Sequence, residues 1–136
     1  MGNANSIQRI NFEDLQVAQA KGWVIINTLP ATEQNVLISS TTLCNDEIRV
    51  VELAIKRKEP IVVYGRHCND ETIYSKYTQI KQLGGQVYLY TGGLFEWILL
   101  QDIYTRVKFP CTGLSDTTVD LLKYKPCNIL NINLKS

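Results

Sequence analysis

The chain has 136 residues, of which 45% are hydrophobic and 20% are charged, and its formal net charge is +1. This length suits one domain with its own hydrophobic core, and the composition excludes a wholly disordered chain. The near-neutral charge, without a basic run, argues against nucleic-acid binding. No apolar stretch reaches the roughly 20 residues that a membrane-spanning helix needs. We therefore expect a soluble single-domain protein.

The first six residues match the pattern for N-myristoylation. Gly2 would become the acyl acceptor once Met1 is removed, and Ser6 stands at the required hydroxyl position. The alternative is a flexible polar start that matches the pattern by chance. Because one myristoyl chain gives only weak and reversible membrane binding, we expect a cytoplasmic protein with at most a transient peripheral membrane contact.

The first third of the chain predicts an arm, a helix and two strands. We expect residues 1–10 to form a flexible arm. Asn11 is typical of a helix N-cap, and Gly22 should end that helix. The continuous apolar run 23–26 predicts a strand covered on both faces, and 36–38 predicts a short second strand.

The remainder of the domain continues this alternation. Asn45 should cap a helix that runs to Lys58 and carries Ile48, Val51 and Ile55 on one apolar stripe. Apolar runs and helical spacing predict four further elements: a strand at 61–64, a helix at 71–83, a strand at 87–90 and a helix from 94 to about 104.

Alternating strands and helices with short links predict an α/β fold, with a central, mostly parallel sheet flanked by helices on both faces. We expect one domain over residues 11–110. Residues 111–136 should form a C-terminal extension packed on the same domain, with one short helix at 116–122.

The four cysteines, Cys44, Cys68, Cys111 and Cys127, are widely spaced and contain no CxxC pair. Since no secretory leader precedes them, we expect free thiols in a reducing compartment. His67 is the one histidine that could join them, so the sequence predicts no metal site and no cofactor.

The polar loop after the strand 61–64 is the candidate site. Ligands of parallel sheets bind beyond the carboxyl ends of the strands, where backbone amides of the next helix converge. Gly65, Asn69, Asp70 and Glu71 are the residues of this loop that we expect to contact an anion.

From about Phe12 to Trp97 the chain resembles the rhodanese-like family. The resemblance is carried by four segments: Ile61-Val62-Val63-Tyr64 running into a loop and helix, Leu83-Gly84, Val87-Tyr88-Leu89-Tyr90, and Thr91-Gly92-Gly93-Leu94-Phe95-Glu96-Trp97. It implies a single rhodanese-like domain, whose active members transfer sulfur through a cysteine persulfide.

The family pattern is incomplete at the loop. Active rhodaneses place the nucleophilic cysteine directly after the strand and an anion-binding arginine five residues later, and the matching positions here are Gly65 and Asp70. Asn27 also stands where many relatives have an aspartate. Related phosphatases need Cys-x5-Arg, but no arginine follows Cys68 before Arg106, so phosphatase chemistry is not expected.

Cys68 lies three residues past the position of the family nucleophile. The nearby helix N-terminus, with His67 and Arg66 as neighbours, favours its reactive thiolate. Asp70 and Glu71 oppose this, because negative charges disfavour a thiolate and repel thiosulfate or phosphate. The same two acids also suit a structural role at the start of the helix.

Three functions follow from these residues. The leading interpretation is a membrane-tethered, rhodanese-like module with a degenerate loop, attached through Gly2, which binds a protein partner or a small ligand without catalysis. The first alternative is a sulfurtransferase or persulfide carrier with Cys68 as a relocated nucleophile, assisted by His67 and Arg66. The second is a redox-sensing domain in which Cys68 is oxidised reversibly.

Overall fold

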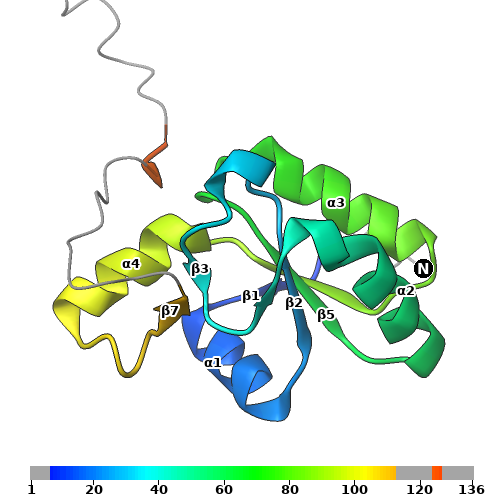
Figure 1. Cartoon of the computed structure of the whole chain (residues 1–136), viewed down its shortest axis with the longest axis horizontal. Helices are drawn as coiled ribbons and strands as arrows, with labels where there is room; N and C mark the ends of the chain where they lie inside the picture. Colours follow the sequence, from blue (N-terminus) through cyan, green and yellow to red (C-terminus); the bar gives the residue numbers. More distant parts are fainter. Residues whose placement is uncertain (1–6, 113–123, 127–136) are drawn as a thin grey trace, which may run out of the picture.

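The computed structural model describes residues 7–112 and 124–126 (Figure 1). The acylation motif with Gly2, the short helix expected at 116–122, and Cys127 lie outside the described residues. The described part contains four α-helices: α1 (Phe12–Lys21), α2 (Glu47–Arg57), α3 (Glu71–Gln82) and α4 (Gly93–Ile103). Its strands are β1 (Arg9–Ile10), β2 (Val24–Asn27), β3 (Leu37–Ile38), β4 (Thr41–Thr42), β5 (Ile61–Tyr64), β6 (Val87–Tyr90) and β7 (Cys111–Thr112).

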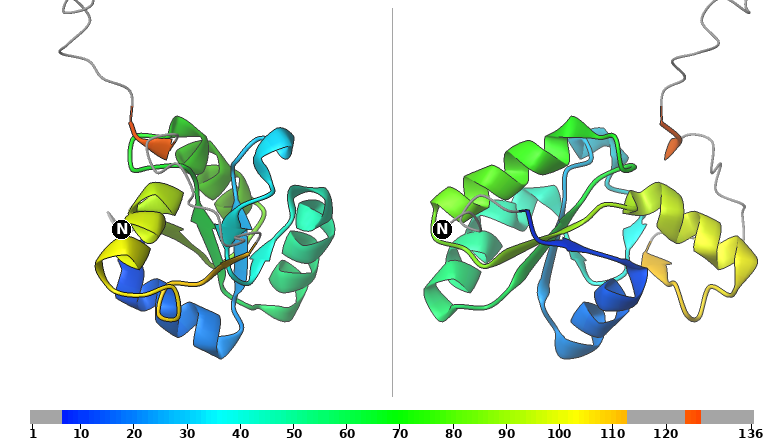
Figure 2. Two further views of the ribbon diagram at one scale, coloured as in Figure 1. Left: turned by 60° about the vertical axis from the view of Figure 1, so that its left-hand side comes forward. Right: turned by 180° about the vertical axis from the view of Figure 1, so that it is seen from behind.

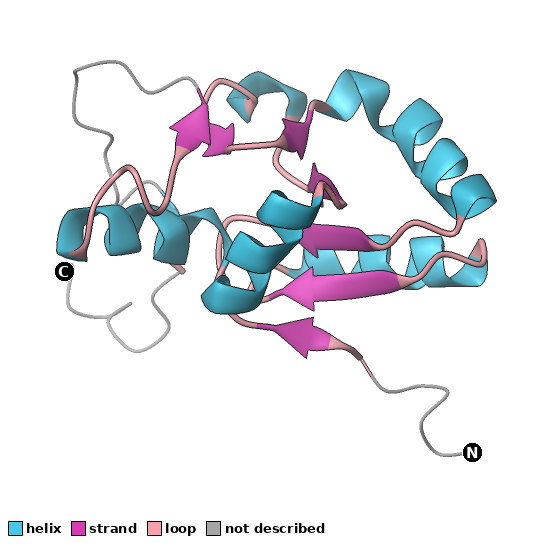
Figure 3. Cartoon of the chain, turned by 90° about the horizontal axis from the view of Figure 1, so that it is seen from below, coloured by secondary structure: helices cyan, strands magenta, loops and turns pink. Residues whose placement is uncertain are grey.

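Five strands form the central sheet in the order β1-β6-β5-β2-β4, and every neighbouring pair is parallel. The longer strands point the same way in Figure 3. In the register, Val62 of β5 lies between Ile25 and Tyr88. The strands β3 and β7 form a separate antiparallel pair. All carboxyl ends of the central strands therefore meet at one edge of the sheet.

The helices cover both faces of this sheet. Figures 1 and 2 show α1 and α4 together on one side, and α2 and α3 on the other. Alternate residues of β5 supply the two cores: Val62 and Tyr64 pack toward α1 and α4, whereas Ile61 and Val63 pack toward α2 and α3. The predicted α/β fold with a mostly parallel sheet is confirmed.

Local signals place the start and the end of α1 as predicted. The Asp14 backbone N–H donates to Asn11 Oδ1 at 2.9 Å, and the Asn11 N–H donates to Asp14 Oδ2 at 3.3 Å, which completes a capping box. Gly22 ends the helix with φ of 74°, a left-handed conformation that glycine adopts without a steric penalty.

The predicted start of the second helix is wrong. Asn45 lies inside a 3₁₀ turn (Cys44–Asp46), and α2 begins only at Glu47. Val51 is buried, whereas Ile48 is 74% exposed and does not belong to the packed stripe. Cap residues in sequence do not distinguish an α-helical start from a preceding 3₁₀ turn.

The domain also begins earlier than expected. Arg9 and Ile10, which we assigned to the arm, form β1 and pair with Leu89 and Tyr90 of β6. The Leu89 backbone N–H donates to Gln8 O at 2.8 Å, which extends this contact by one residue. The arm therefore ends before Gln8.

Described residues beyond the last helix pack on the same domain. The Trp97 indole N–H donates to Pro110 O at 3.0 Å, which fixes the path of the chain beside α4. Cys111 then pairs with Ile38 in the β3–β7 ladder. Tyr124 is 1% exposed and belongs to the core under α1 and α4. None of the helices in the described ranges is long and apolar enough to cross a membrane.

Candidate functional site

The loop of residues 65–70 joins β5 to α3 at the carboxyl edge of the sheet. The first amides of α4 do not face an open site here but bind this loop: Leu94 N–H donates to Gly65 O at 2.9 Å, and Phe95 N–H donates to Arg66 O at 2.8 Å. Gly93 makes this approach possible, since it has φ of 70° and a Cβ there would lie 2.8 Å from Gly65 O. The loop is thus clamped to α4 by its own backbone.

Asp70 closes the loop from the other side. It is the N-cap of α3, and its Oδ1 accepts from the Thr72 backbone N–H at 3.1 Å. Its second oxygen, Oδ2, accepts from the Arg66 backbone N–H at 3.2 Å. This carboxylate therefore binds amide donors that could otherwise have faced an external anion. Asp70 has the structural role, as the cap of a helix, that the sequence offered as one interpretation.

Gly65, at the position of the family nucleophile, is buried and has no room for a side chain. A Cβ at Gly65 would lie 2.6 Å from Asp70 Oδ2, 2.7 Å from Ile73 Cγ2 and 2.8 Å from Thr28 Oγ1. Real Cβ atoms essentially never come within 3.0 Å of such neighbours. A cysteine here would have to displace the capping carboxylate. The space beside Gly65 is consequently filled by neighbouring side chains.

Arg66 is held in an ion pair with Glu33, in the 3₁₀ turn Ala31–Glu33. The Arg66 side chain is 36% exposed and that of Glu33 is 16% exposed. Glu33 Oε1 is buried, and no described residue gives it a hydrogen bond. Burial, followed by the Glu33 charge, raises the pKa of the Tyr124 hydroxyl. The charge of Arg66 is thus largely neutralised within the protein.

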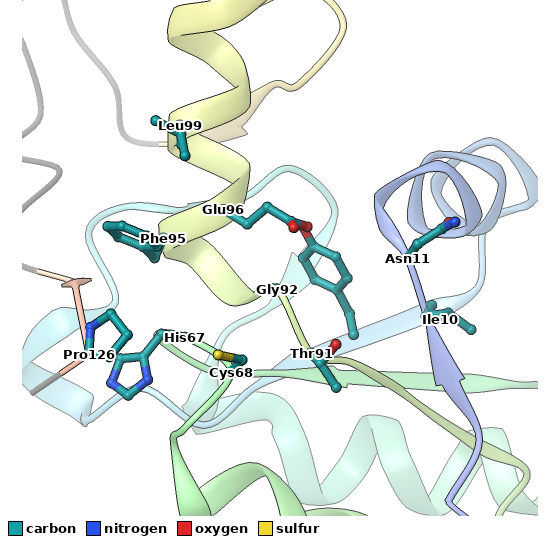
Figure 4. A pocket seen from close by; sticks show the side chains of 11 residues that line it. Ile10, Asn11, His67, Cys68, Thr91, Gly92, Phe95, Glu96, Leu99 and Pro126 are labelled. Atoms are coloured by element: carbon teal, nitrogen blue, oxygen red, sulfur yellow. The ribbon is translucent and has the colours of Figure 1, made fainter.

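His67 and Cys68 point into a pocket of about 380 Å³ (Figure 4). The Asn69 backbone N–H donates to His67 Nδ1 at 3.1 Å, so this ring nitrogen acts as an acceptor within the loop. Cys68 is exposed, and its thiol donates to Asn69 Oδ1 at 3.8 Å rather than to the imidazole. The structure brings these two candidates together without a hydrogen bond between them.

The remaining walls of the pocket come from β1, β6, α4 and the C-terminal segment. Ile10, Phe95, Leu99 and Pro126 make most of this lining apolar. Asn11, Thr91 and Gly92 complete the rim.

Two residues that the sequence did not single out meet in this pocket. The Tyr90 hydroxyl, from the end of β6, donates to Glu96 Oε1 of α4 at 2.5 Å. Burial first, and the adjacent Glu96 carboxylate second, raise the pKa of Tyr90, so its phenol stays a neutral donor. One signal could have found Glu96: it is the one polar residue in the run 93–100, which is otherwise apolar.

Asn27 anchors the loop after β2 through its side-chain amide. Its Oδ1 accepts from the Leu29 backbone N–H at 3.0 Å and from Gln34 Nε2 at 2.8 Å. Its Nδ2 donates to Thr42 O at 3.2 Å. An aspartate could not make this last bond, because a carboxylate only accepts.

Metal coordination finds no support in the described ranges, where no group of three or more His, Cys, Asp or Glu side chains could hold an ion. Glu71 is exposed in the first turn of α3, where an acid stabilises the helix dipole. Of the four residues expected to contact an anion, Gly65 and Asp70 thus close the loop, and Glu71 adds a negative charge.

No family model and no curated protein matches this chain by sequence. Solved structures of similar fold include the BH2092 protein from Bacillus halodurans, with a TM-score of 0.58 and 16% identity over 69% of this chain and 73% of that one. The Alr3790 protein from Anabaena sp. has a TM-score of 0.57 and 18% identity over 79% and 82%. A full-length protein from Lactobacillus plantarum has a TM-score of 0.57 and 20% identity over 78% and 88%. At these identities the similarity shows the α/β fold alone.

Proposed function

We propose that this protein is a rhodanese-like module that has lost sulfur transfer and acts by binding a protein partner. The resemblance of its sequence motifs to the family supports the scaffold. One observation carries the loss of catalysis: the space beside Gly65 is filled by Asp70, Ile73 and Thr28. A module that keeps the fold while its loop is closed is suited to recognition.

Charge supports the same conclusion. Asp70 replaces the arginine that would hold an anionic sulfur donor, and Arg66 is neutralised by Glu33. An incoming thiosulfate would meet the Asp70 carboxylate and, one residue on, that of Glu71. Like charges within a few ångströms disfavour binding. The loop therefore lacks the nucleophile and repels the substrate class.

Incubation of the full chain with thiosulfate, followed by intact-mass measurement and peptide mapping, tests this proposal. We expect no gain of a sulfur atom at any cysteine and no thiocyanate when cyanide is added. Dithiothreitol-reversible sulfur at Cys68, lost in Cys68→Ser, would overturn the proposal and favour the persulfide carrier.

A matched variant tests whether the scaffold is of the rhodanese type. Gly65→Cys combined with Asp70→Arg restores both residues of the family pattern and removes the carboxylate that fills the site. We expect this double variant to gain a persulfide from thiosulfate, whereas Gly65→Cys alone should not. A folded double variant that stays inert would contradict the assignment to this family.

Attachment through Gly2 is the second part of the proposal. The motif supports acylation, and a single chain would give only reversible membrane contact. Co-expression with N-myristoyltransferase and myristate should add one acyl chain to the wild type and none to Gly2→Ala, as read by intact mass. An unmodified wild type would remove the tether and leave the binding module.

The exposure of Cys68 favours a second candidate function, a redox sensor. It is the exposed thiol among Cys44, Cys68 and Cys111, and it faces a pocket. Dilute hydrogen peroxide followed by dimedone would detect a sulfenic acid. Selective labelling of Cys68 supports sensing, and labelling no faster than at Cys44 rules against it.

A further inference from the structure

The pocket beside α4 contains a carboxylate that no described cation neutralises. Glu96 is half-buried, and the salt bridges of the described residues join Arg49 to Asp46, Arg66 to Glu33 and Lys76 to Glu47. The hydrogen bond from Tyr90 is neutral, because burial keeps this phenol protonated. Removing a charge partly from water without an opposite charge beside it costs free energy. A cation therefore binds more favourably to such a carboxylate than to one on an open surface.

The apolar walls of the pocket indicate which kind of chemical group would carry the cation. Ile10 of β1 and Phe95 and Leu99 of α4 present apolar side chains around the same space (Figure 4). Glu96 is the one carboxylate among the lining residues, and none of them is a lysine or an arginine. This surface fits a group with an apolar stem and a positive end.

The geometry of the carboxylate favours an ammonium over a guanidinium. Glu96 Oε1 is already engaged by the Tyr90 hydroxyl at 2.5 Å. A guanidinium binds best when both carboxylate oxygens accept its two parallel N–H groups. An ammonium is a compact charge that one free oxygen can satisfy, and its four-carbon stem packs along apolar walls.

We propose that this pocket receives a lysine side chain of a protein partner, with its ammonium at Glu96 and its stem against Phe95, Leu99 and Ile10. The proposal rests on the binding function proposed above and names the group that is recognised. It assigns the contact to Glu96 and the apolar side chains of the pocket, and not to the backbone amides or the Asp70 carboxylate of the loop of residues 65–70.

A titration of the ¹⁵N-labelled full chain followed by NMR tests the site. The probe is N-acetyl-lysine N-methylamide, and N-acetyl-norleucine N-methylamide is the matched neutral probe. We expect the lysine probe to shift the amides of Thr91, Gly92 and Phe95, and the norleucine probe to bind at least about tenfold more weakly, since a charge-assisted hydrogen bond is lost. Added salt should weaken the lysine probe alone.

Two variants complete the test. Glu96→Gln keeps the size and an acceptor for Tyr90 but removes the charge, and should weaken the lysine probe by about tenfold. Glu52→Gln removes an exposed acid of α2 and should leave its binding unchanged. If Glu96→Gln fails to fold, Tyr90→Phe serves instead: it keeps the charge, frees Oε1 and should bind the lysine probe at least as tightly.

Equal binding of both probes, or binding that survives Glu96→Gln, would overturn the lysine pocket, and so would the absence of any shift. These results are separable from the proposed loss of catalysis, which the thiosulfate experiment decides alone. A chain that is inert to thiosulfate and does not bind the lysine probe loses this site and keeps the proposed module.

Discussion

The loop of residues 65–70 and the pocket beside α4 lie at the same carboxyl edge of one sheet, but their polar groups are arranged in opposite ways. In the loop, Asp70 accepts two backbone N–H groups and the Arg66 charge is paired with Glu33. In the pocket, Glu96 has one neutral donor among the described residues, and Cys68 is exposed. The polar groups of the loop are thus satisfied by one another, whereas the Glu96 carboxylate in the pocket can still bind a cation.

This contrast shows that the position of a site in a fold does not decide whether it can act. The carboxyl edge of a parallel sheet offers amides and a concave surface to any ligand. Which of these groups remain free depends on a few side chains, here Asp70 and Gly65 on one flank and Tyr90 and Glu96 on the other.

The largest expected effect is a difference in thiol reactivity between Cys68, which is exposed at the pocket, and Cys111, which is shielded from solvent. Burial raises the pKa of the Cys111 thiol from 9.0 to about 12, so at pH 8 almost none of it is thiolate. We expect iodoacetamide to label Cys68 at least about a hundredfold faster than Cys111, measured by peptide mapping over time. Raising the pH from 8 to 10 should speed the Cys111 reaction by about tenfold per unit, because thiolate grows with pH below the pKa. Equal rates at pH 8 would contradict the closed surroundings of Cys111.

The next largest effect tests whether the loop is filled. Gly65→Ala should lower the free energy of unfolding by about 2 kcal/mol, since its Cβ would strike the Asp70 carboxylate. Asp70→Ala alone should cost about 1 kcal/mol through loss of the N-cap.

The double variant separates these causes. Without the Asp70 carboxylate, a Cβ at position 65 meets fewer atoms. The free energy of unfolding lost in the double variant should therefore be about 1 kcal/mol smaller than the sum of the losses in Gly65→Ala and Asp70→Ala. Urea denaturation of all four proteins measures this coupling. Strict additivity would mean that Asp70 does not occupy the space beside Gly65.

The smallest effect is the difference in stability, about 1 kcal/mol, between variants that remove two tyrosine hydroxyls. Tyr64 is fully buried, and its oxygen accepts from the Ile38 backbone N–H at 3.1 Å. Tyr64→Phe leaves that N–H unpaired and should cost about 2 kcal/mol. Tyr90→Phe removes a donor from the half-buried Glu96, which water can reach through the pocket, and should cost less than about 1 kcal/mol. Thermal unfolding measures the loss of stability in each variant. A larger loss in Tyr90→Phe than in Tyr64→Phe would contradict an open pocket.

The features that the sequence predicted are those fixed by neighbours in the chain. Asn11 and Asp70 cap helices through bonds to residues two or three positions away, and each is recognisable from its residue type. The runs 61–64 and 87–90 are almost entirely buried, with Tyr88 the one half-buried residue, because helices cover both faces of the parallel sheet.

The features that it could not predict depend on contacts between distant residues. The two residues of β1 are too few to show a period, and they are a strand only because the edge of β6 receives them. The Arg66–Glu33 pair joins positions 33 apart in sequence. The pocket itself needs β1, β6, α4 and Pro126 to converge, which no single segment encodes.

The early start of β1 limits how far an acylated molecule could rise from a bilayer. Six residues, 2–7, separate an acyl chain on Gly2 from Gln8, which is bound to β6, and an extended chain spans at most about 3.4 Å per residue, or roughly 20 Å in all. That linker is shorter than a small domain is wide, which is about 30 Å. A tethered molecule would therefore stay in the layer next to the headgroups, and a partner would have to present its lysine within that layer.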